Sequence, residues 1–241
     1  MNKTQLVCIC LLLTGCGGNN NDSDSDKTKP EPELFYRPFQ GNYLNSWPFD
    51  HHYPTGAFHD DCDIIATDDA LTWRGEILDI SWNTKCHNAH DWIMPVGTPL
   101  LAVADGEVIF AGEDDPVMCG SLGEVSAMAV VIQHTLFTDE IFETYYVHLS
   151  QIDVEKGQWV DANQQIGLSG TTGCTTGPHL HFAVFRLTNT NNGTRTAVDP
   201  FGWNGAGTDP WSIHPDGAES VFLWREGQAP SGDYGFYTHR E

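Results

Sequence analysis

The sequence is poor in basic residues. Only 11 of its 241 residues are Lys or Arg, against 33 Asp and Glu, so the formal net charge is −22 at pH 7. A protein that binds nucleic acid needs a basic surface to displace the counterions of the phosphate backbone, and this composition excludes a broad one. The acidic balance predicts a well-solvated surface and no nucleic-acid partner, and it does not select a substrate.

Long regular patterns are also missing, because the chain has no internal repeat and no long amphipathic helical pattern. The apolar run at residues 6–13 is too short to cross a bilayer as a mature helix. Short apolar runs with Gly-containing turns predict antiparallel β structure instead. The runs that predict strands are 100–103, 108–111, 127–133, 143–149 and 164–169. We also expect a hairpin-type turn at 104–106 and, at most, a short helical turn near 150–154.

The first residues have the pattern of an export signal. A short positive start precedes the apolar run, and the run ends in LTGC at residues 13–16, which resembles the bacterial lipobox. We therefore expect a signal peptide over 1–15 and a lipidated Cys16 that anchors the protein to a membrane. The alternative is an ordinary signal peptide cut nearby. Residues 16–33 predict a flexible tether, and the expected location is the periplasmic side of the bacterial cell envelope, at the outer membrane.

Export also bears on the cysteines, since disulfides persist in oxidising compartments. Four cysteines remain after the signal peptide and the lipidation site: Cys62, Cys86, Cys119 and Cys174. They allow three pairings, of which we favour Cys62–Cys86 and Cys119–Cys174, because each would hold a loop expected to border the functional site. Cysteine ligation of zinc is the competing interpretation, but the sequence has no CxxC pair.

A turn followed by a strand at residues 177–182 (GPHLHF) carries two histidines. Side chains alternate across a strand, so His179 and His181 point to one face, about 7 Å apart along the backbone. Leu180 and Phe182 face the other side, where a core can cover them. Two imidazoles on a rigid element suit a metal site. The alternative is one surface histidine and one core histidine, so the interpretation depends on what else converges there.

Three other stretches supply groups of matching chemistry. His87 and Asp91 are four residues apart in a segment that leads into strands, and an imidazole and a carboxylate can share one cation. His148 stands at a strand end, in residues 146–149 (YVHL). Residues 167–177 are rich in glycine, which allows sharp turns and close approach of the backbone to a ligand. This loop therefore predicts a cleft wall.

Together these motifs resemble the M23 (lysostaphin/LytM-type) zinc endopeptidases of peptidoglycan. The resemblance rests on HxxxD at 87–91, YxHL at 146–149, the Gly-rich loop at 167–177, GPHLHF at 177–182 and VDP at 198–200. The motifs follow family order and spacing over roughly half of the chain. The resemblance implies a mainly β fold, with an antiparallel sheet core of the LytM/M23 (duplicated-hybrid-motif-like) type, a groove walled by loops, and irregular N- and C-terminal extensions.

The resemblance also implies roles for individual residues. His87, Asp91 and His181 would bind Zn²⁺ and leave its fourth position open for water. His148 and His179 would be the catalytic pair beside the metal. Strand geometry alone does not say which of His179 and His181 is the ligand, so that assignment comes from the family.

Two positions depart from the family pattern. Ala89 stands where the family usually has Gly, which costs little unless the position needs a positive φ. His90 is unusual beside Asp91, and we favour a solvent-facing side chain over one that supports the metal ligands. For the remaining histidines we expect surface or packing roles (His51, His52 and His59) and a structural role near the site (His134).

These expectations divide the chain after the tether into an irregular aromatic-rich extension (34–80), a peptidase domain (81–202) and a C-terminal extension (203–241). The predicted protein is a monomer that hydrolyses peptide bonds in peptidoglycan cross-links or stems. The alternative is a catalytically silent LytM-like regulator that binds other cell-wall hydrolases. A third possibility is zinc proteolysis of protein or attack on other cells. All five polar positions of the motif set are present, which favours the enzyme.

Overall fold

The computed structural model describes residues 34–54, 69–79, 86–136, 140–189 and 194–234. This part of the chain contains fifteen β-strands, two short 3₁₀ helices (η1, Gly120–Leu122, and η2, Trp211–Ile213) and no α-helix. Among the described residues, no helix has the length and apolar character needed to cross a bilayer. The predicted signal peptide, Cys16 and the tether lie outside the described residues.

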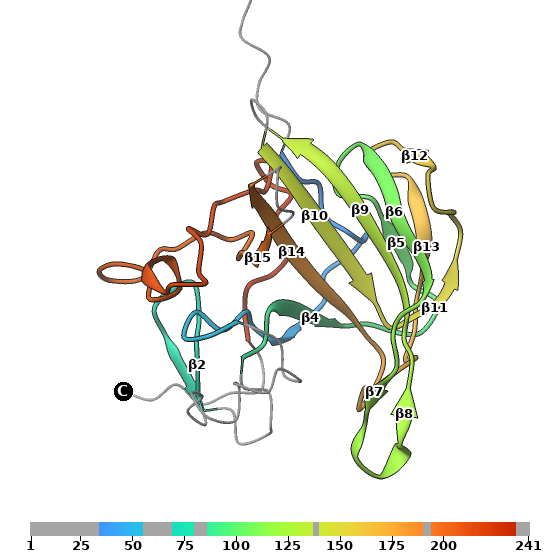
Figure 1. Ribbon diagram of the computed structural model, residues 1–241, viewed down its shortest axis with the longest axis horizontal. Helices are drawn as coiled ribbons and strands as arrows, with labels where there is room; N and C mark the ends of the chain where they lie inside the picture. The colour runs from blue at the N-terminus through green and yellow to red at the C-terminus, as the bar shows by residue number, and fades with distance from the viewer. Residues whose placement is uncertain (1–33, 55–68, 80–85, 137–139, 190–193, 235–241) are drawn as a thin grey trace, which may run out of the picture. The chain divides into compact units, whose positions relative to one another are not determined.

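The largest sheet has eight strands, and all its pairings are antiparallel. Its order is β1–β4–β14–β10–β9–β6–β12, with β15 paired to β14, and Figure 1 shows β14, β10 and β9 side by side. The strands are β1 (Asn45–Trp47), β4 (Ala89–Ile93), β14 (His179–Asn189), β10 (Glu140–Val147), β9 (Met128–Leu136), β6 (Gly106–Glu113), β12 (Trp159–Val160) and β15 (Thr194–Ala197). The predicted mainly β, antiparallel fold class is confirmed.

A second sheet has three strands in the order β11–β13–β5. These strands are β11 (Leu149–Ile152), β13 (Gln165–Ser169) and β5 (Pro99–Leu101). Two strand pairs complete the fold: β2 (Asp69–Leu71) with β3 (Ile77–Asp79), and β7 (Val117–Met118) with β8 (Glu124–Val125).

Two local predictions are wrong. The turn at 104–106 does not close a hairpin, because β5 pairs with β13 whereas β6 pairs with β9 and β12, in another sheet. Residues 150–154 do not form a helical turn, since β11 continues through Ile152. In both places the pairing partner lies far away in sequence, so a local pattern could not reveal it.

One hydrophobic cluster holds the two sheets together. It contains Leu100, Leu149 and Ile166 from the smaller sheet, and inward-facing residues of the larger sheet such as Ile132 and Phe182. All five side chains are inaccessible to solvent. The alternation of the strands therefore sets the core, as period-two patterning predicts.

Segments at both ends of the chain share this core. Phe35 and Trp224 belong to the same hydrophobic cluster, their rings meet edge to face, and a short parallel bridge joins their backbones. β1, within the segment predicted to be irregular, pairs with β4 at the edge of the large sheet. The domain boundaries drawn from the sequence remain predictions, but the described part of each extension packs on the strands that carry the predicted site.

His134 on β9 is buried between the sheet and Phe35. Its Nδ1–H donates to the Asp105 carbonyl oxygen (2.8 Å), and its Nε2 accepts from the Thr144 hydroxyl (2.8 Å). Burial lowers the pKa of His134 to about 4. The structural role is as predicted, but its expected place near the site is wrong. His134 lies opposite Phe142 on β10, whereas His181 lies opposite Val147 on the same strand. These two positions on β10 are five residues apart, which is about 17 Å.

We predict that protonation of His134 destabilises the fold in mild acid. Its pKa is lowered from 6.5 to about 4 on folding, so its contribution is complete above pH 6.5 and is lost as the pH falls toward 4. The loss at about pH 5 is about 2 kcal/mol. Between pH 7.5 and pH 5, the measured free energy of unfolding should fall by about 2 kcal/mol more in the wild type than in His134→Gln. Equal losses in the two proteins would contradict this account.

Candidate metal centre

The pairing of β4 with β14 brings two predicted ligands together. In this antiparallel register His181 lies directly opposite Asp91, so their side chains project from the same face at the same level. His87 precedes β4, and its Nδ1–H donates to the Pro48 carbonyl oxygen (2.9 Å). This bond turns the other ring nitrogen, Nε2, toward Asp91.

Three ligand atoms converge at this place. The Asp91 Oδ1 atom lies 3.0 Å from His181 Nδ1 and 3.3 Å from His87 Nε2, and the two ring nitrogens are 3.3 Å apart. Zinc bound at 2.0–2.1 Å with tetrahedral geometry requires ligand atoms about 3.3 Å apart. The two nitrogens and one carboxylate oxygen can therefore hold one divalent metal ion, in a site where the three side chains are mostly buried.

The electrostatics of Asp91 and His181 suit a cation, whereas the Asp91 carboxylate outweighs burial and raises the pKa of His87, so a metal ion must displace a proton from that ring. Burial opposes ionisation of Asp91, but the surrounding His87, His179 and His181 outweigh it and hold the pKa of this carboxyl well below its usual range. Burial lowers the pKa of His181, which favours the neutral imidazole that a metal requires. The carboxylate is thus available without loss of a proton.

The other two predicted residues lie beside this group. The His148 and His179 rings are 4.6 Å apart between centroids, and the His148 ring is 5.8 Å from that of His181. His148 Nδ1–H donates to the Thr172 carbonyl oxygen (2.7 Å), and His179 Nδ1–H donates to the Gly177 carbonyl oxygen (2.8 Å). The Nε2 atom of His148 is thereby left to act on a ligand, whereas the Nε2 atom of His179 lies 3.4 Å from Asp91 Oδ2. All five predicted site residues converge in the structure.

His148 occupies an unusual backbone position and an unusual electrostatic one. It stands between β10 and β11 with φ of 68°, a region that residues other than glycine rarely adopt. Burial, together with the neighbouring His181 and His179, lowers the pKa of His148 to about 4. This ring is therefore neutral near pH 7 and can accept a proton at Nε2.

The Gly-rich loop at 167–177 supplies two of the carbonyl oxygens that orient these rings. A Cβ atom at Gly170 would lie 2.5 Å from the Ser150 backbone nitrogen, so only glycine fits there. A disulfide between Cys119 and Cys174 ties the loop to the turn between β7 and β8, as the sequence analysis proposed. The other proposed pairing involves Cys62, outside the described residues, and stays a prediction.

The departures from the family pattern have different outcomes. Ala89 lies in β4 without a positive φ, so glycine is not needed there. The prediction that His90 faces solvent is wrong: the side chain is fully buried and hydrogen-bonded to Asn45 and Asp199. Alternation along β4 aims His90 inward because Asp91 faces the site, and the segments that cover it come from both ends of the chain.

His51 is buried, as a packing role predicts, but both of its ring nitrogens also hydrogen-bond to carboxylates, those of Asp199 and Asp209. The side chain of His52 is about one-third exposed, and His59 lies outside the described residues. The carbonyl groups of Pro48, Thr172 and Gly177, which orient the site histidines, were not identified from the sequence. The glycines of the loop were the one signal that pointed toward two of them.

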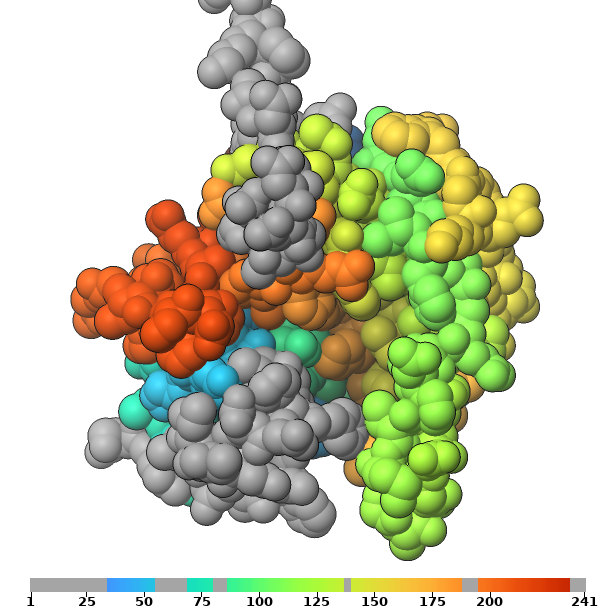
Figure 2. Space-filling model, viewed as in Figure 1, coloured from blue at the N-terminus to red at the C-terminus, as the bar shows by residue number. Residues whose placement is uncertain are grey.

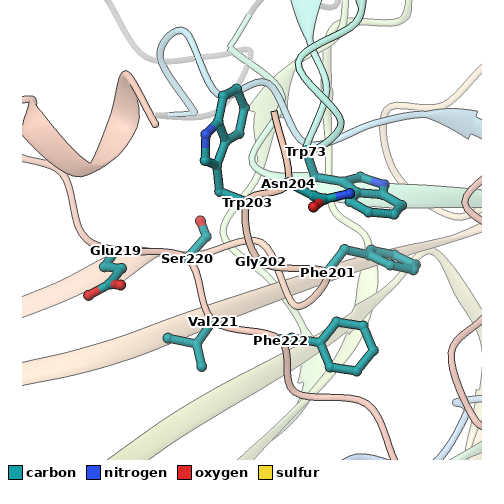
Figure 3. Close-up of a pocket in the computed structure, with 9 residues that line it drawn as sticks. All are labelled: Trp73, Phe201, Gly202, Trp203, Asn204, Glu219, Ser220, Val221 and Phe222. Carbon is teal, nitrogen blue, oxygen red and sulfur yellow. The ribbon is translucent and has the colours of Figure 1, made fainter. Parts of the chain in front are cut away.

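A separate hollow of about 440 Å³ lies where the chain leaves the VDP motif. Figure 3 shows its aromatic side chains, Trp73, Phe201, Trp203 and Phe222, around an open space. None of the five site residues lines it. Phe201 also packs against His90, with 4.9 Å between ring centroids, so the wall of the hollow borders the back of β4.

Comparison with known proteins agrees with this geometry. The model of the family described as "Peptidase family M23" matches residues 85–200, a segment that contains all five site residues. This segment of the chain, residues 85–200, belongs to peptidase family M23.

Relatives of this M23 chain include two curated cell-wall enzymes. Peptidoglycan DD-endopeptidase ShyA of Vibrio cholerae is 44% identical over 98 residues, which cover 41% of this chain and 20% of ShyA. Lysostaphin of Staphylococcus simulans is 34% identical over 118 residues, which cover 49% of this chain and 21% of lysostaphin. The M23 chain thus spans about a fifth of the length of these relatives.

Solved structures give a similar comparison. The catalytic domain of lysostaphin from Staphylococcus simulans is 25% identical, with a TM-score of 0.42, over 66% of this chain and 90% of that one. A zinc-containing peptidase from Vibrio cholerae is 27% identical, with a TM-score of 0.43, over 64% of this chain and 37% of that one.

We predict that the M23 chain binds one divalent metal ion through His87, Asp91 and His181. Titration of the metal-free protein with Co²⁺ or Zn²⁺ should give one site per chain. His181→Ala should weaken that site by more than about 100-fold, because changes outside the ligand shell alone cost 10–100-fold. His214→Ala, which changes a histidine outside the site, should bind as the wild type does. Equal affinity of the wild type and His181→Ala would contradict the ligand assignment.

Proposed function

We propose that this M23 chain is a zinc-dependent endopeptidase that hydrolyses peptide bonds in peptidoglycan cross-links or stems. The observation that carries the proposal is the convergence of a His–Asp–His group with two further histidines in one site. The relatives support the choice of substrate, since ShyA is named a peptidoglycan DD-endopeptidase and ALE-1 of Staphylococcus capitis a glycyl-glycine endopeptidase.

His87, Asp91 and His181 would hold the zinc ion, with two neutral nitrogen ligands and one charged oxygen ligand. A zinc ion in such a site supplies Lewis-acid chemistry, which polarises a scissile carbonyl and makes an attacking water more acidic. The positions of the three side chains matter because they would determine the side from which a substrate can approach the metal ion. The Pro48 carbonyl keeps the His87 ring in the orientation that the site needs.

His148 and His179 would handle the protons of the reaction. Each ring donates its Nδ1–H to a backbone carbonyl, so Nε2 is the nitrogen of each ring that can take part in the reaction, and that of His179 lies 3.4 Å from Asp91 Oδ2. One neutral ring can accept the proton of the attacking water, and the other can stabilise the developing oxyanion or protonate the leaving amine. The loop carbonyls of Thr172 and Gly177 therefore set the tautomer on which this proton transfer depends.

The proposed place of action is the bacterial cell envelope. A lipidated Cys16 would attach the protein to a membrane, expected to be the outer one, and residues 16–33 would let a monomeric catalytic domain reach the wall. The rival function, a silent regulator of other wall hydrolases, is less well supported, because its hallmark is loss of site residues and this chain has the complete set.

We predict that the purified protein converts cross-linked muropeptides to monomers. Peptidoglycan from diderm cells would be digested with wild type and His148→Ala, and the released muropeptides analysed by mass. Removal of a residue that transfers protons should lower the rate by at least about 100-fold while the metal content stays at one ion per chain. The masses of the products identify the bond that is cleaved.

The control for this assay is His214→Ala, which should cleave at the wild-type rate. A wild-type protein that binds metal yet leaves every cross-link and stem intact would contradict the endopeptidase proposal. Cleavage that survives in His148→Ala would contradict the role of this histidine.

A further inference from the structure

A hydrogen-bonded chain of buried polar side chains runs behind the metal centre. Asn45 Nδ2–H donates to His90 Nδ1 (2.8 Å), and His90 Nε2–H donates to Asp199 Oδ1 (3.0 Å). On its other side Asp199 Oδ2 accepts from His51 Nε2–H (3.1 Å), and His51 Nδ1–H donates to Asp209 Oδ1 (2.9 Å). We call these five residues the rear network. The mechanism proposed above uses none of them.

The rear network is almost completely buried, and its charged groups are hydrogen-bonded to one another. Asn45, His51, His90 and Asp199 have no accessible surface, and Asp209 is 4% exposed. Both ring nitrogens of His51 face carboxylates, which requires the protonated ring. Burial disfavours that charge, but the hydrogen bonds to Asp199 and Asp209 outweigh it and raise the pKa of His51 to about 9. Removal of the His51 side chain would leave the Asp199 and Asp209 carboxylates without their shared cation in the interior.

The rear network joins three parts of the chain that are distant in sequence. His90 and Asp199 lie within the segment 85–200 matched by the family, whereas the other three lie outside it. Asn45 belongs to β1 and His51 follows it, and Asp209 precedes η2. Asp199 is the junction, because its backbone nitrogen also donates to Ser220 Oγ (3.1 Å) in the C-terminal extension.

β4 is the element on which this network acts. The strand has five residues, and its outer neighbour β1 pairs with it at only two positions, with an irregular register. That side of β4 is otherwise held by one backbone bond, from Ile93 N–H to the Leu44 carbonyl oxygen (3.0 Å), and by the Ser46 hydroxyl, which donates to the Asp91 carbonyl oxygen (3.2 Å). His90 adds a side-chain bond to β1 and another to Asp199, directly next to Asp91, whose carboxylate projects from the opposite face of the same strand.

We propose that the rear network positions the metal ligand Asp91 by holding β4 from behind, so that residues of both extensions support the metal centre from outside it. The inference rests on the proposed function in one respect, the binding of metal by Asp91. His51 and Asp209 are positioning residues: they touch neither metal nor substrate and act on β4 through Asp199 and His90.

The test compares His51→Phe with His134→Phe in the full-length protein. Each wild-type histidine is completely buried and makes two ring hydrogen bonds, so loss of either should lower the melting temperature. The two differ in place, because His51 belongs to the rear network and His134 lies far along β9. We expect His51→Phe to weaken Co²⁺ binding by about 10–100-fold and to alter the visible spectrum of bound Co²⁺. His134→Phe should keep both the wild-type affinity and the spectrum.

Each other outcome bears on the proposal. Wild-type Co²⁺ affinity and spectrum in folded His51→Phe would overturn it, as would an equal loss of affinity in His134→Phe. If His51→Phe does not fold, Asp209→Asn keeps the shape of the side chain and removes its charge, and a smaller loss of affinity in the same direction is expected. A wild-type protein that binds no Co²⁺ would show instead that the proposed metal centre fails, independently of the rear network.

Discussion

The antiparallel pairing of β4 with β14 is the constraint on which the site depends. It places Asp91 opposite His181, and the alternation of the two strands then separates two environments. On one face are the histidines and the carboxylate that can hold a metal, and on the other are Leu180 and Phe182 in the core. A shift of one residue in this register would send Asp91 into the core and His90 into the site, so the pairing must be held firmly.

The histidines of this chain show how burial and partners divide one residue type among several tasks. His148 is kept neutral by burial and by neighbouring imidazoles, and it offers a lone pair to the site. His51 is kept charged by two carboxylates, and it holds segments together. His134 is kept neutral by burial among backbone and hydroxyl partners. The chain has a net charge of −22, so carboxylates are plentiful. Whether a histidine has a carboxylate partner therefore depends on where it lies in the fold.

The five site residues are predicted by motifs that resemble those of a known family, and local geometry predicts only part of the site. Period-two alternation places His179 and His181 on one face, and the glycines of the loop at 167–177 mark a tight connection beside them. The sequence does not predict the environment of His90, because the residues that cover it, Asn45 and Asp199, are 45 and 109 positions away. The same limit explains why the hairpin predicted at 104–106 is wrong. The local pattern fits a hairpin, but pairing with strands distant in sequence places β5 and β6 in different sheets.

The central claim is that His87, Asp91 and His181 form one metal site in the resting protein. The most direct measurement is X-ray diffraction from crystals of the zinc-loaded protein, with anomalous differences collected on both sides of the zinc absorption edge. The account predicts a single strong anomalous peak within about 2.2 Å of His87 Nε2, Asp91 Oδ1 and His181 Nδ1. A peak coordinated by His148 and His179 instead, or no peak near Asp91 in crystals that contain zinc, would contradict it.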